Sequence, residues 1–211
     1  MKHGFFTTFE GVEGSGKSTQ IRCLAATGEG AGVRVRLTRE PGGSAVAERI
    51  RDLLLHPPGD GNSAMGEALL HYAARRDHLD HVILPALRAG QWVICDRYAD
   101  STMAYQGHGF NLGAATVAAL HDLVIGAFAP DLTIILDLPV EIGLARARAR
   151  SPAGDRYERL DVAFHQRVRD AFLDIARAEP ERCIVIDAEP APEIVAAAVR
   201  HAVAPRLGVS L

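Results

Sequence analysis

The stretch GVEGSGKST, residues 11–19, decides the fold, because it fits the phosphate-binding pattern G-x-x-x-x-G-K-[ST]. It follows an apolar run at 5–9 and precedes a segment with helical spacing at 19–26, as a phosphate loop requires. Glycines let successive backbone N–H groups converge on phosphate oxygens, and the start of the helix adds partial positive charge. The alternative is a glycine-rich turn that only joins a strand to a helix. We predict a nucleotide-binding P-loop.

Within this loop, we expect Lys17 to bridge the β- and γ-phosphates of a nucleoside triphosphate and the Ser18 hydroxyl to ligate Mg²⁺. The pattern names no reaction, because the same loop serves switches, motors and kinases. All nine residues are predicted to surround the triphosphate: Gly11, Val12, Glu13, Gly14, Ser15, Gly16, Lys17, Ser18 and Thr19.

Four further apolar runs follow the first, at 33–38, 92–95, 132–138 and 183–186. Between them lie segments with helical spacing at 45–55, 64–88, 114–128, 140–150 and 160–178, and one more, at 192–203, closes the chain; Pro85 is expected to kink the long one. Strands that alternate with helices at this density indicate a parallel sheet covered on both faces. We predict a three-layer α/β/α fold of the P-loop NTPase type, with a five-stranded parallel sheet, in a single domain spanning residues 1–211.

The composition narrows the functional classes. The 211 residues carry a formal net charge of −3, which argues against a general nucleic-acid binder. Cys23, Cys95 and Cys183 are far apart in the sequence and are expected to be free thiols. The short apolar stretch near the N-terminus is too short for a signal peptide, and no segment approaches the length of a membrane span. We expect a soluble cytoplasmic protein that binds neither nucleic acid nor membrane.

Charged residues follow the predicted strands, at the edge where parallel sheets bind ligands. Arg39 and Arg97 each come immediately after a strand. Asp96 closes the run at 92–95 as a carboxylate that positions Mg²⁺ should, and Asp137 fits the same template. We favour Asp96, because Arg97 beside it supplies a second charge that can face phosphate; Asp137 is more typical of a helix start.

A third basic cluster, RARARSPAGDRYER, spans residues 146–159. Arg146 and Arg150 are four residues apart and share a helix face, and Pro152 and Gly154 then break the helix. A basic helix end that leads into such a break is typical of a mobile lid over phosphates. The alternative is a solvated helix end whose arginines favour the helix dipole.

Taken together, GVEGSGKST, TREPGG, YAARRD, DRYADSTMAYQG and the RARAR…DRYE segment closely resemble the bacterial thymidylate kinase family in order and spacing. The resemblance covers most of the first 160 residues, and VIDA near the C-terminus extends it. TREPGG combined with DRY…AYQG is its most specific part. It implies a P-loop nucleoside monophosphate kinase, commonly a homodimer, which transfers the γ-phosphate of ATP to dTMP with Mg²⁺ and gives dTDP.

The resemblance also implies roles for individual residues. Glu13 turns away from ATP toward the acceptor sugar, and Arg150 or Arg156 of the lid reaches the transferring phosphate. On the acceptor side, Arg97 and Arg39 hold the phosphate and Arg75 meets the base, although Arg75 and Arg76 could also pair with Asp77 and Asp80. The remaining expected substrate contacts are Thr102 and Gln106 in the base pocket and Tyr105 where a ribose 2′-hydroxyl would lie.

Two segments depart from the family pattern. His71 stands where the family often has a phenylalanine that stacks on the base, and HGFNLG replaces a stretch that usually contains arginine. Two other functions compete with the kinase of dTMP. One is a deoxynucleoside kinase, which would need a carboxylate base near a neutral hydroxyl. The other is a non-catalytic P-loop switch or assembly ATPase; a GTPase would need N-K-x-D, which is absent from the sequence.

Overall fold

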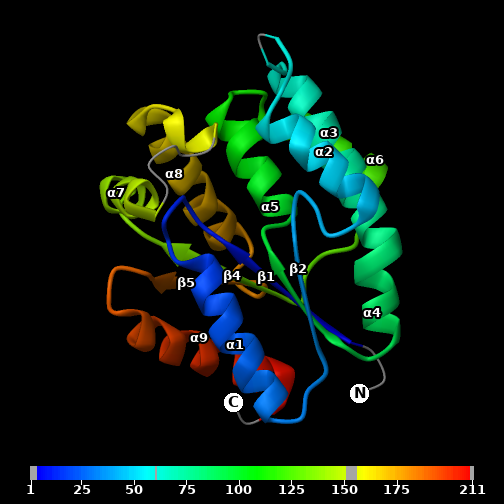
Figure 1. Cartoon of the computed structure of the whole chain (residues 1–211), viewed down its shortest axis with the longest axis vertical. Helices are drawn as coiled ribbons and strands as arrows, with labels where there is room; N and C mark the ends of the chain where they lie inside the picture. Colours follow the sequence, from blue (N-terminus) through cyan, green and yellow to red (C-terminus); the bar gives the residue numbers. More distant parts are fainter. Residues whose placement is uncertain (1–3, 60, 151–155, 210–211) are drawn as a thin grey trace.

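The computed structural model describes residues 4–59, 61–150 and 156–209. It contains five parallel strands in the order β2-β3-β1-β4-β5 (Figure 1). The predicted five-stranded parallel sheet is confirmed. The strands are β1 (Phe5–Glu10), β2 (Val35–Arg39), β3 (Trp92–Asp96), β4 (Leu132–Asp137) and β5 (Cys183–Asp187).

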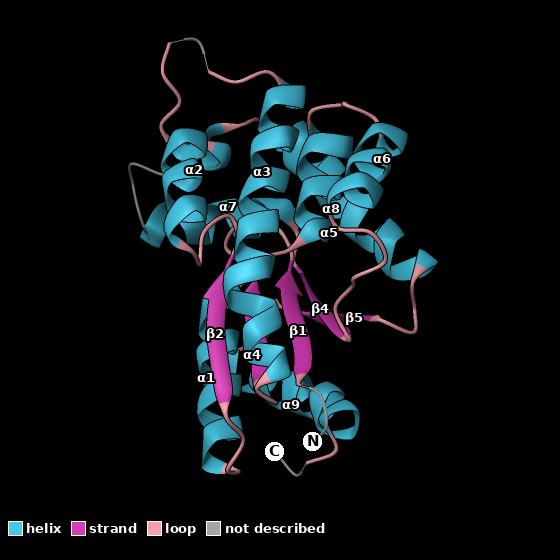
Figure 2. Cartoon of the chain, turned by 90° about the vertical axis from the view of Figure 1, so that its right-hand side faces the viewer, coloured by secondary structure: helices cyan, strands magenta, loops and turns pink. Residues whose placement is uncertain are grey.

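Helices lie on both faces of this sheet (Figure 2). Helix α1 (Lys17–Gly30) packs beside α9 (Pro192–Leu207) and contacts β1, β2 and β3, whereas α4 (Leu84–Arg88) contacts β3 and α8 (Val162–Ala178) contacts β4 and β5. The central strands β1, β3 and β4 are largely buried, as a sheet covered on both faces requires, whereas the edge strands β2 and β5 are partly exposed. The other helical elements are α2 (Ala45–Leu55), α3 (Ala64–His78), α5 (Ala99–Thr102), α6 (Ala114–Val124), α7 (Val140–Arg150) and the 3-10 turn η3 (Tyr157–Arg159).

The long helix expected at 64–88 is continuous but irregular. Its regular part α3 passes into a π-helical turn, η1 (Leu79–Ile83), and then into α4. Pro85 lacks the N–H that would bond four residues back, and its ring needs space there. The wider turn just before Pro85 provides that space, so the irregularity lies upstream of the expected kink.

The helical structure that follows β3 was not predicted. The segment after β3 forms α5 and then the π-helical turn η2 (Met103–Gly109). Its polar residues and two glycines lack the apolar spacing that marks a helix in sequence. Tertiary packing supplies the missing signal: Ala104, Tyr105 and Gln106 are all buried, and η2 contacts α6 and α8.

Two smaller expectations concern the thiols and the membrane. All three cysteines are free: Cys95 and Cys183 are buried, while Cys23 is exposed on α1. Burial raises the pKa of the Cys95 thiol well above its usual value, so it stays protonated and unreactive. Among the described helices, none combines the length and the apolar character needed to cross a lipid bilayer.

Candidate active site

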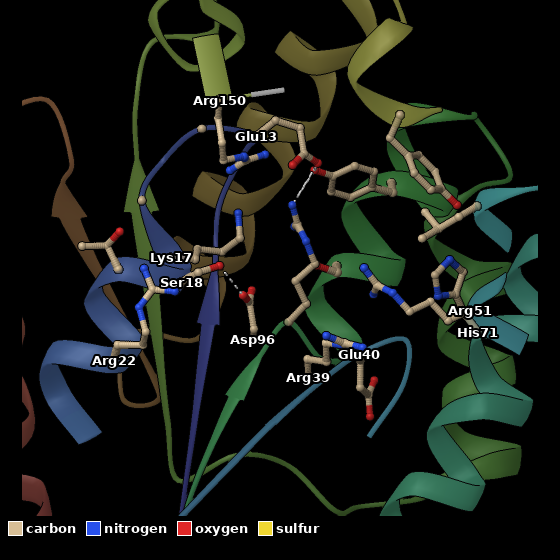
Figure 3. A pocket seen from close by; sticks show the side chains of 18 of the residues that line it. Glu13, Lys17, Ser18, Arg22, Arg39, Glu40, Arg51, His71, Asp96 and Arg150 are labelled. Atoms are coloured by element: carbon tan, nitrogen blue, oxygen red, sulfur yellow. Dashed lines mark hydrogen bonds and ion pairs between the residues drawn. The ribbon is translucent and has the colours of Figure 1, made fainter. Parts of the chain in front are cut away.

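A cavity of about 490 Å³ lies beyond the carboxyl ends of β1, β2 and β3 (Figure 3). It brings together side chains from the P-loop, α1, α2, α3, the segment after β3 and the end of α7. The lining residues are Glu13, Gly14, Gly16, Lys17, Ser18, Thr19, Arg22, Arg39, Glu40, Arg51, Leu55, His71, Asp96, Arg97, Ser101, Tyr105, Gln106, Arg150 and Tyr157.

The P-loop forms one wall of the cavity. Gly14 and Gly16 have φ of 70° and 88°, the left-handed region that favours glycine. A side chain at Gly14 would also collide with the carbonyl oxygen of Gly143 on α7, so the loop is packed tightly against that helix. The Lys17 ammonium donates to the carbonyl oxygens of Gly11 and Val12 at 2.9 and 3.0 Å. Burial, aided by Arg97, lowers the pKa of Lys17 to about 8.

The two candidate magnesium carboxylates have different surroundings. Asp96 lines the cavity and accepts a hydrogen bond from the Ser18 hydroxyl at 3.0 Å. Asp137 instead forms a two-point ion pair with Arg169 of α8, at 2.7 and 2.9 Å. Hard oxygen ligands beside a phosphate loop suit Mg²⁺. The geometry therefore supports the choice of Asp96 over Asp137.

Glu13 faces Arg97 across the cavity rather than the inside of the P-loop. Its carboxylate accepts hydrogen bonds from Arg97 Nη2 at 2.9 Å and from the Tyr105 hydroxyl at 2.6 Å. Burial opposes ionisation, but Arg97, Lys17 and the Tyr105 hydrogen bond lower the pKa of Glu13 to about 2. Glu13 is therefore ionised throughout the neutral range and its charge is fully paired.

Arg97 is fixed in a strained position just after β3. Its φ of 69° is rare for a residue other than glycine. Its guanidinium also donates to the Gly11 carbonyl oxygen and to Ser101 Oγ, each at 3.1 Å, and lies 5.0 Å from the centre of the Tyr105 ring. Backbone strain held by this many contacts is typical of functional positions.

Arg75 and Thr102, both expected to meet a base, lie outside the set of described residues that line the cavity. Arg75 is 1% exposed; its Nε donates to Glu40 at 2.7 Å and its Nη2 donates to Thr102 Oγ1 at 2.9 Å. Its Nη1 is buried and has no acceptor among the described residues. The suggested pairing of Arg75 with Asp77 or Asp80 is wrong, whereas Arg76 does pair with Asp80.

His71 and Gln106 lie at the end of the cavity nearest α3. Burial, with Arg75 nearby, lowers the pKa of His71 to about 3, so its imidazole is neutral. Gln106 Nε2 donates to Glu67 at 3.1 Å. Two buried atoms, His71 Nε2 and Gln106 Oε1, have no partner among the described residues. Each is available to a ligand.

The basic cluster at 146–159 divides into three parts. Arg146 donates to the carbonyl oxygens of Ala188 and Glu189, both at 2.9 Å, so it anchors α7 rather than facing the cavity. Arg150 lines the cavity and pairs with Glu158 at 2.9 Å. Arg156 pairs with Glu67 on α3. Residues 151–155, the centre of the expected lid, lie outside the described part of the chain.

Several cavity residues were missed or differently paired. Arg39 lines the cavity but forms an ion pair with Glu48 at 3.0 Å. Arg51 of α2, which the sequence analysis did not single out, donates to the Pro41 carbonyl oxygen at 2.9 Å. Glu40, Arg22 and Tyr157 were also missed. Glu40 lies within TREPGG and Tyr157 within DRYE, whereas Arg22 belongs to no motif and lines the cavity from α1.

Comparisons with known proteins agree on one family. The family model described as thymidylate kinase matches residues 9–199. A thymidylate kinase of Caulobacter vibrioides is 54% identical over 99% of this chain and 100% of its own length. One from Pseudomonas fluorescens is 54% identical over 88% of each chain. The crystal structure of thymidylate kinase from Ehrlichia chaffeensis covers 95% of this chain and 98% of its own, at 38% identity and a TM-score of 0.76.

Proposed function

The chain belongs to the thymidylate kinase family, enzymes that phosphorylate dTMP to dTDP, and we propose that it does so with the γ-phosphate of ATP, assisted by Mg²⁺. One observation carries the proposal: Lys17 and Arg97 line the same cavity, and both donate to the Gly11 carbonyl oxygen, at 2.9 and 3.1 Å. We call residues 11–19 the donor wall. We call Arg39, Glu40, Arg51, His71, Arg97, Tyr105 and Gln106 the acceptor wall.

The chemistry fits this arrangement. The acceptor oxygen of a nucleoside monophosphate is already ionised at neutral pH, so the reaction needs no base to create a nucleophile. Its barrier is the repulsion between two anionic nucleotides that must meet in line. Lys17, Arg97 and Arg150 present positive charge to one cavity, and this charge can neutralise the phosphates as the bond forms and breaks.

The donor wall suits ATP and Mg²⁺. We propose that the backbone N–H groups of 11–19 hold the phosphates and that Lys17 leaves the Gly11 and Val12 carbonyls to bind them. Ser18 and Asp96, already 3.0 Å apart, would hold Mg²⁺ directly or through its waters. The metal would supply charge neutralisation at the phosphates.

The acceptor wall, together with Arg75 that pairs with Glu40 of this wall, suits a pyrimidine with a carbonyl oxygen next to a ring N–H. Arg75 Nη1 is an unused donor and Gln106 Oε1 is an unused acceptor, and both are buried. Leaving such atoms without a partner costs about 1–3 kcal/mol each, so a ligand that pairs with both binds better. We propose that His71 stacks on the base, that Thr102 holds Arg75 in place and that Tyr105 crowds a ribose 2′-hydroxyl.

The state of Glu13 separates this function from a deoxynucleoside kinase. A kinase of a neutral hydroxyl needs a carboxylate that can take up its proton. Glu13 has a pKa of about 2 and is already bound to Arg97 and Tyr105, which makes it a poor base. We propose that Glu13 orients Arg97 and an acceptor hydroxyl. Arg39 and Arg51 would be further ligands of the acceptor phosphate. Arg150 or Arg156 would close over the transferring phosphate.

A coupled ADP-release assay tests the proposal directly. Purified protein with ATP and Mg²⁺ would be offered dTMP, dUMP, dCMP, dAMP, dGMP, UMP and thymidine in turn. We expect the highest kcat/KM with dTMP, lower values with dUMP and UMP, and none above background with thymidine. Phosphorylation of thymidine, or a preference for another monophosphate, would overturn it.

A cytoplasmic homodimer stays a prediction, and sedimentation velocity measures the oligomeric state.

A further inference from the structure

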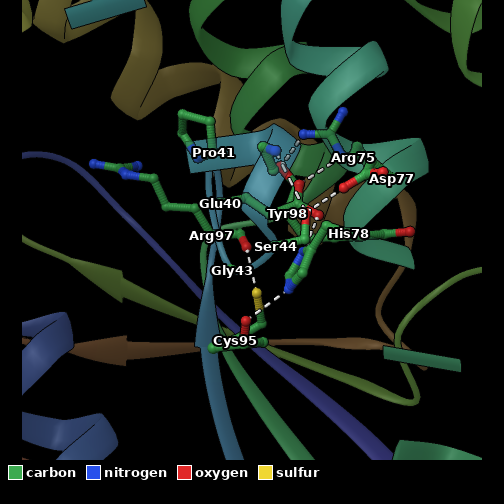
Figure 4. A network of polar contacts seen from close by, with 12 residues as sticks. Glu40, Pro41, Gly43, Ser44, Arg75, Asp77, His78, Cys95, Arg97 and Tyr98 are labelled. Atoms are coloured by element: carbon green, nitrogen blue, oxygen red, sulfur yellow. Dashed lines mark hydrogen bonds and ion pairs between the residues drawn. The ribbon is translucent and has the colours of Figure 1, made fainter. Parts of the chain in front are cut away.

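A buried polar chain links the edge strand of the sheet to the acceptor wall (Figure 4). The Thr38 hydroxyl lies 2.6 Å from His78 Nε2, and His78 Nδ1 lies 3.0 Å from Glu40 Oε1. The other oxygen of Glu40 accepts from Arg75 Nε at 2.7 Å. His78 is 0% exposed, Arg75 1% and Glu40 5%, so solvent does not compete for the two bonds of Glu40, whereas Thr38 is half-buried.

The chemistry of the chain defines the direction of each bond. Glu40, as the partner of a guanidinium, offers only acceptors, so His78 Nδ1 carries the hydrogen that it donates. The two oxygens of Glu40 are then divided between His78 and Arg75. Because both lie on α3, three residues apart, Glu40 sits over one face of that helix.

The loop after β2 closes tightly over this arrangement. A side chain at Gly43, whose φ is 86°, would collide with both His78 Nε2 and Thr38 Oγ1. Beside it, the Ser44 hydroxyl donates to Asp77, the neighbour of His78. The loop that carries Arg39 and Glu40 into the cavity is thus held against the C-terminal end of α3.

This polar chain ends at the guanidinium of Arg75. Arg75 Nε is taken by Glu40, and Nη2 is shared by the Tyr98 carbonyl oxygen and Thr102 Oγ1 at 3.0 and 2.9 Å. Only Nη1 is left without an acceptor among the described residues. If Glu40 turned, Nε and Nη1 would compete for it and the free N–H would no longer point in a fixed direction.

We infer that His78 is a positioning residue for the acceptor nucleotide: by fixing Glu40, it aims the free N–H of Arg75. The inference rests on the proposed function, in which Arg75 meets the base. His78 itself touches no substrate. Its loss should therefore weaken binding of the acceptor nucleotide and leave ATP binding unaffected, since within the described part of the protein the hydrogen bonds of this polar chain do not reach residues 11–19.

Two substitutions of similar size separate positioning from simple packing. His78→Asn keeps a donor at the position of Nδ1, facing Glu40, whereas His78→Gln keeps a polar group near Nε2, facing Thr38. We expect His78→Gln to raise KM for dTMP about tenfold, because a buried carboxylate oxygen loses its donor, with KM for ATP within about twofold. His78→Asn should restore most of the affinity. His201→Asn on the exposed face of α9 is the control.

The outcomes are distinct. Equal effects of Asn and Gln, or equal changes in KM for both nucleotides, would overturn the inference. If the His78 variants do not fold, Glu40→Gln tests the same link, because its amide nitrogen replaces one of the two oxygens that His78 and Arg75 share: KM for dTMP should rise while KM for ATP stays within about twofold, and an unchanged KM for dTMP would overturn the inference. Arg75→Ala identifies the source of a failure. If it leaves KM for dTMP unchanged, the proposed base contact is wrong; if it raises KM while His78→Gln does not, only the role of His78 is wrong.

Discussion

The two walls of the cavity are built in different ways. The donor wall is one continuous stretch, residues 11–19, whose proposed phosphate ligands are mostly backbone groups and whose shape depends on glycines at positive φ. The acceptor wall collects side chains from the segment after β2, from α2 and α3, and from the segment after β3. These side chains are held by buried ion pairs between residues far apart in sequence, such as Glu40 with Arg75. The geometry of the donor wall is therefore local to one short stretch of sequence, whereas the geometry of the acceptor wall depends on the complete fold.

It follows that substitutions in the two walls should affect different nucleotides. Hydrogen bonds from the acceptor wall to the donor wall come from Arg97, to Gly11 and Glu13, and from Tyr105, to Glu13. A substitution on one side should therefore change the kinetics of one substrate far more than the other. Glu13 and Arg97, which connect the walls, are where this independence is weakest.

The largest effect is expected at Lys17. Lys17→Ala removes the only ammonium group that faces the cavity among the described residues, and should lower kcat about 10³-fold because charge developing on the transferring phosphate is no longer neutralised. The affinity for dTMP should not change. Steady-state kinetics and a dTMP titration measure both, and a loss of dTMP binding equal to that of ATP would break the separation of the walls.

A smaller effect is expected at Glu13, the anion within the donor wall. Glu13→Ala should lower kcat roughly 30-fold, since Arg97 loses a charged partner worth about 1.5–3 kcal/mol, and KM for ATP should stay nearly unchanged. Glu29→Ala, at the exposed end of α1, serves as the matched control. Glu13 would belong to the ATP site instead if binding of ATP fell in proportion to turnover.

The pKa of Lys17 makes the donor wall sensitive to alkaline pH. With a pKa of about 8, the free enzyme loses the ammonium charge as pH rises through 8. Because kcat/KM reports the free enzyme, kcat/KM for ATP should fall about tenfold per pH unit above that point. Lys17→Arg keeps its charge and should flatten the profile. Identical profiles for the two proteins would assign the titration to another group.

The smallest effect is expected at His71. His71→Phe should lower KM for dTMP about threefold, because a phenyl ring offers more area for stacking on a base than a neutral imidazole. The kcat should change little. A higher KM in the variant would instead indicate that His71 Nε2, which has no partner among the described residues, makes a hydrogen bond to the nucleotide.

The same contrast explains what the sequence could and could not predict. The five apolar runs gave the sheet, and residues 11–19 gave the P-loop with Lys17 and Ser18, because strand alternation and glycine spacing are local signals. Arg51 carries no such signal, since it reaches the cavity from α2, whereas Glu40 lies within TREPGG directly after β2 and was not singled out. Helix α5 and turn η2, like Arg51, lack a local signal and were missed.

The residues that were predicted from the family resemblance were only partly placed correctly. Arg97, Tyr105 and Gln106 line the cavity as expected. Arg75 is not among the described residues that line the cavity, and its partner is Glu40 rather than Asp77 or Asp80. A motif conveys which residues gather at a site, but the bonds among them depend on distances that the sequence does not contain.

Calorimetric titration of Arg97→Ala with each nucleotide alone tests the central claim, that one cavity holds two nucleotides on two separate walls. We expect the Kd for dTMP to rise about 30-fold, as a charged hydrogen bond to phosphate is lost, while the Kd for ATP stays within about twofold of the unmodified protein. Equal weakening of both nucleotides, or no weakening of dTMP, would contradict the account.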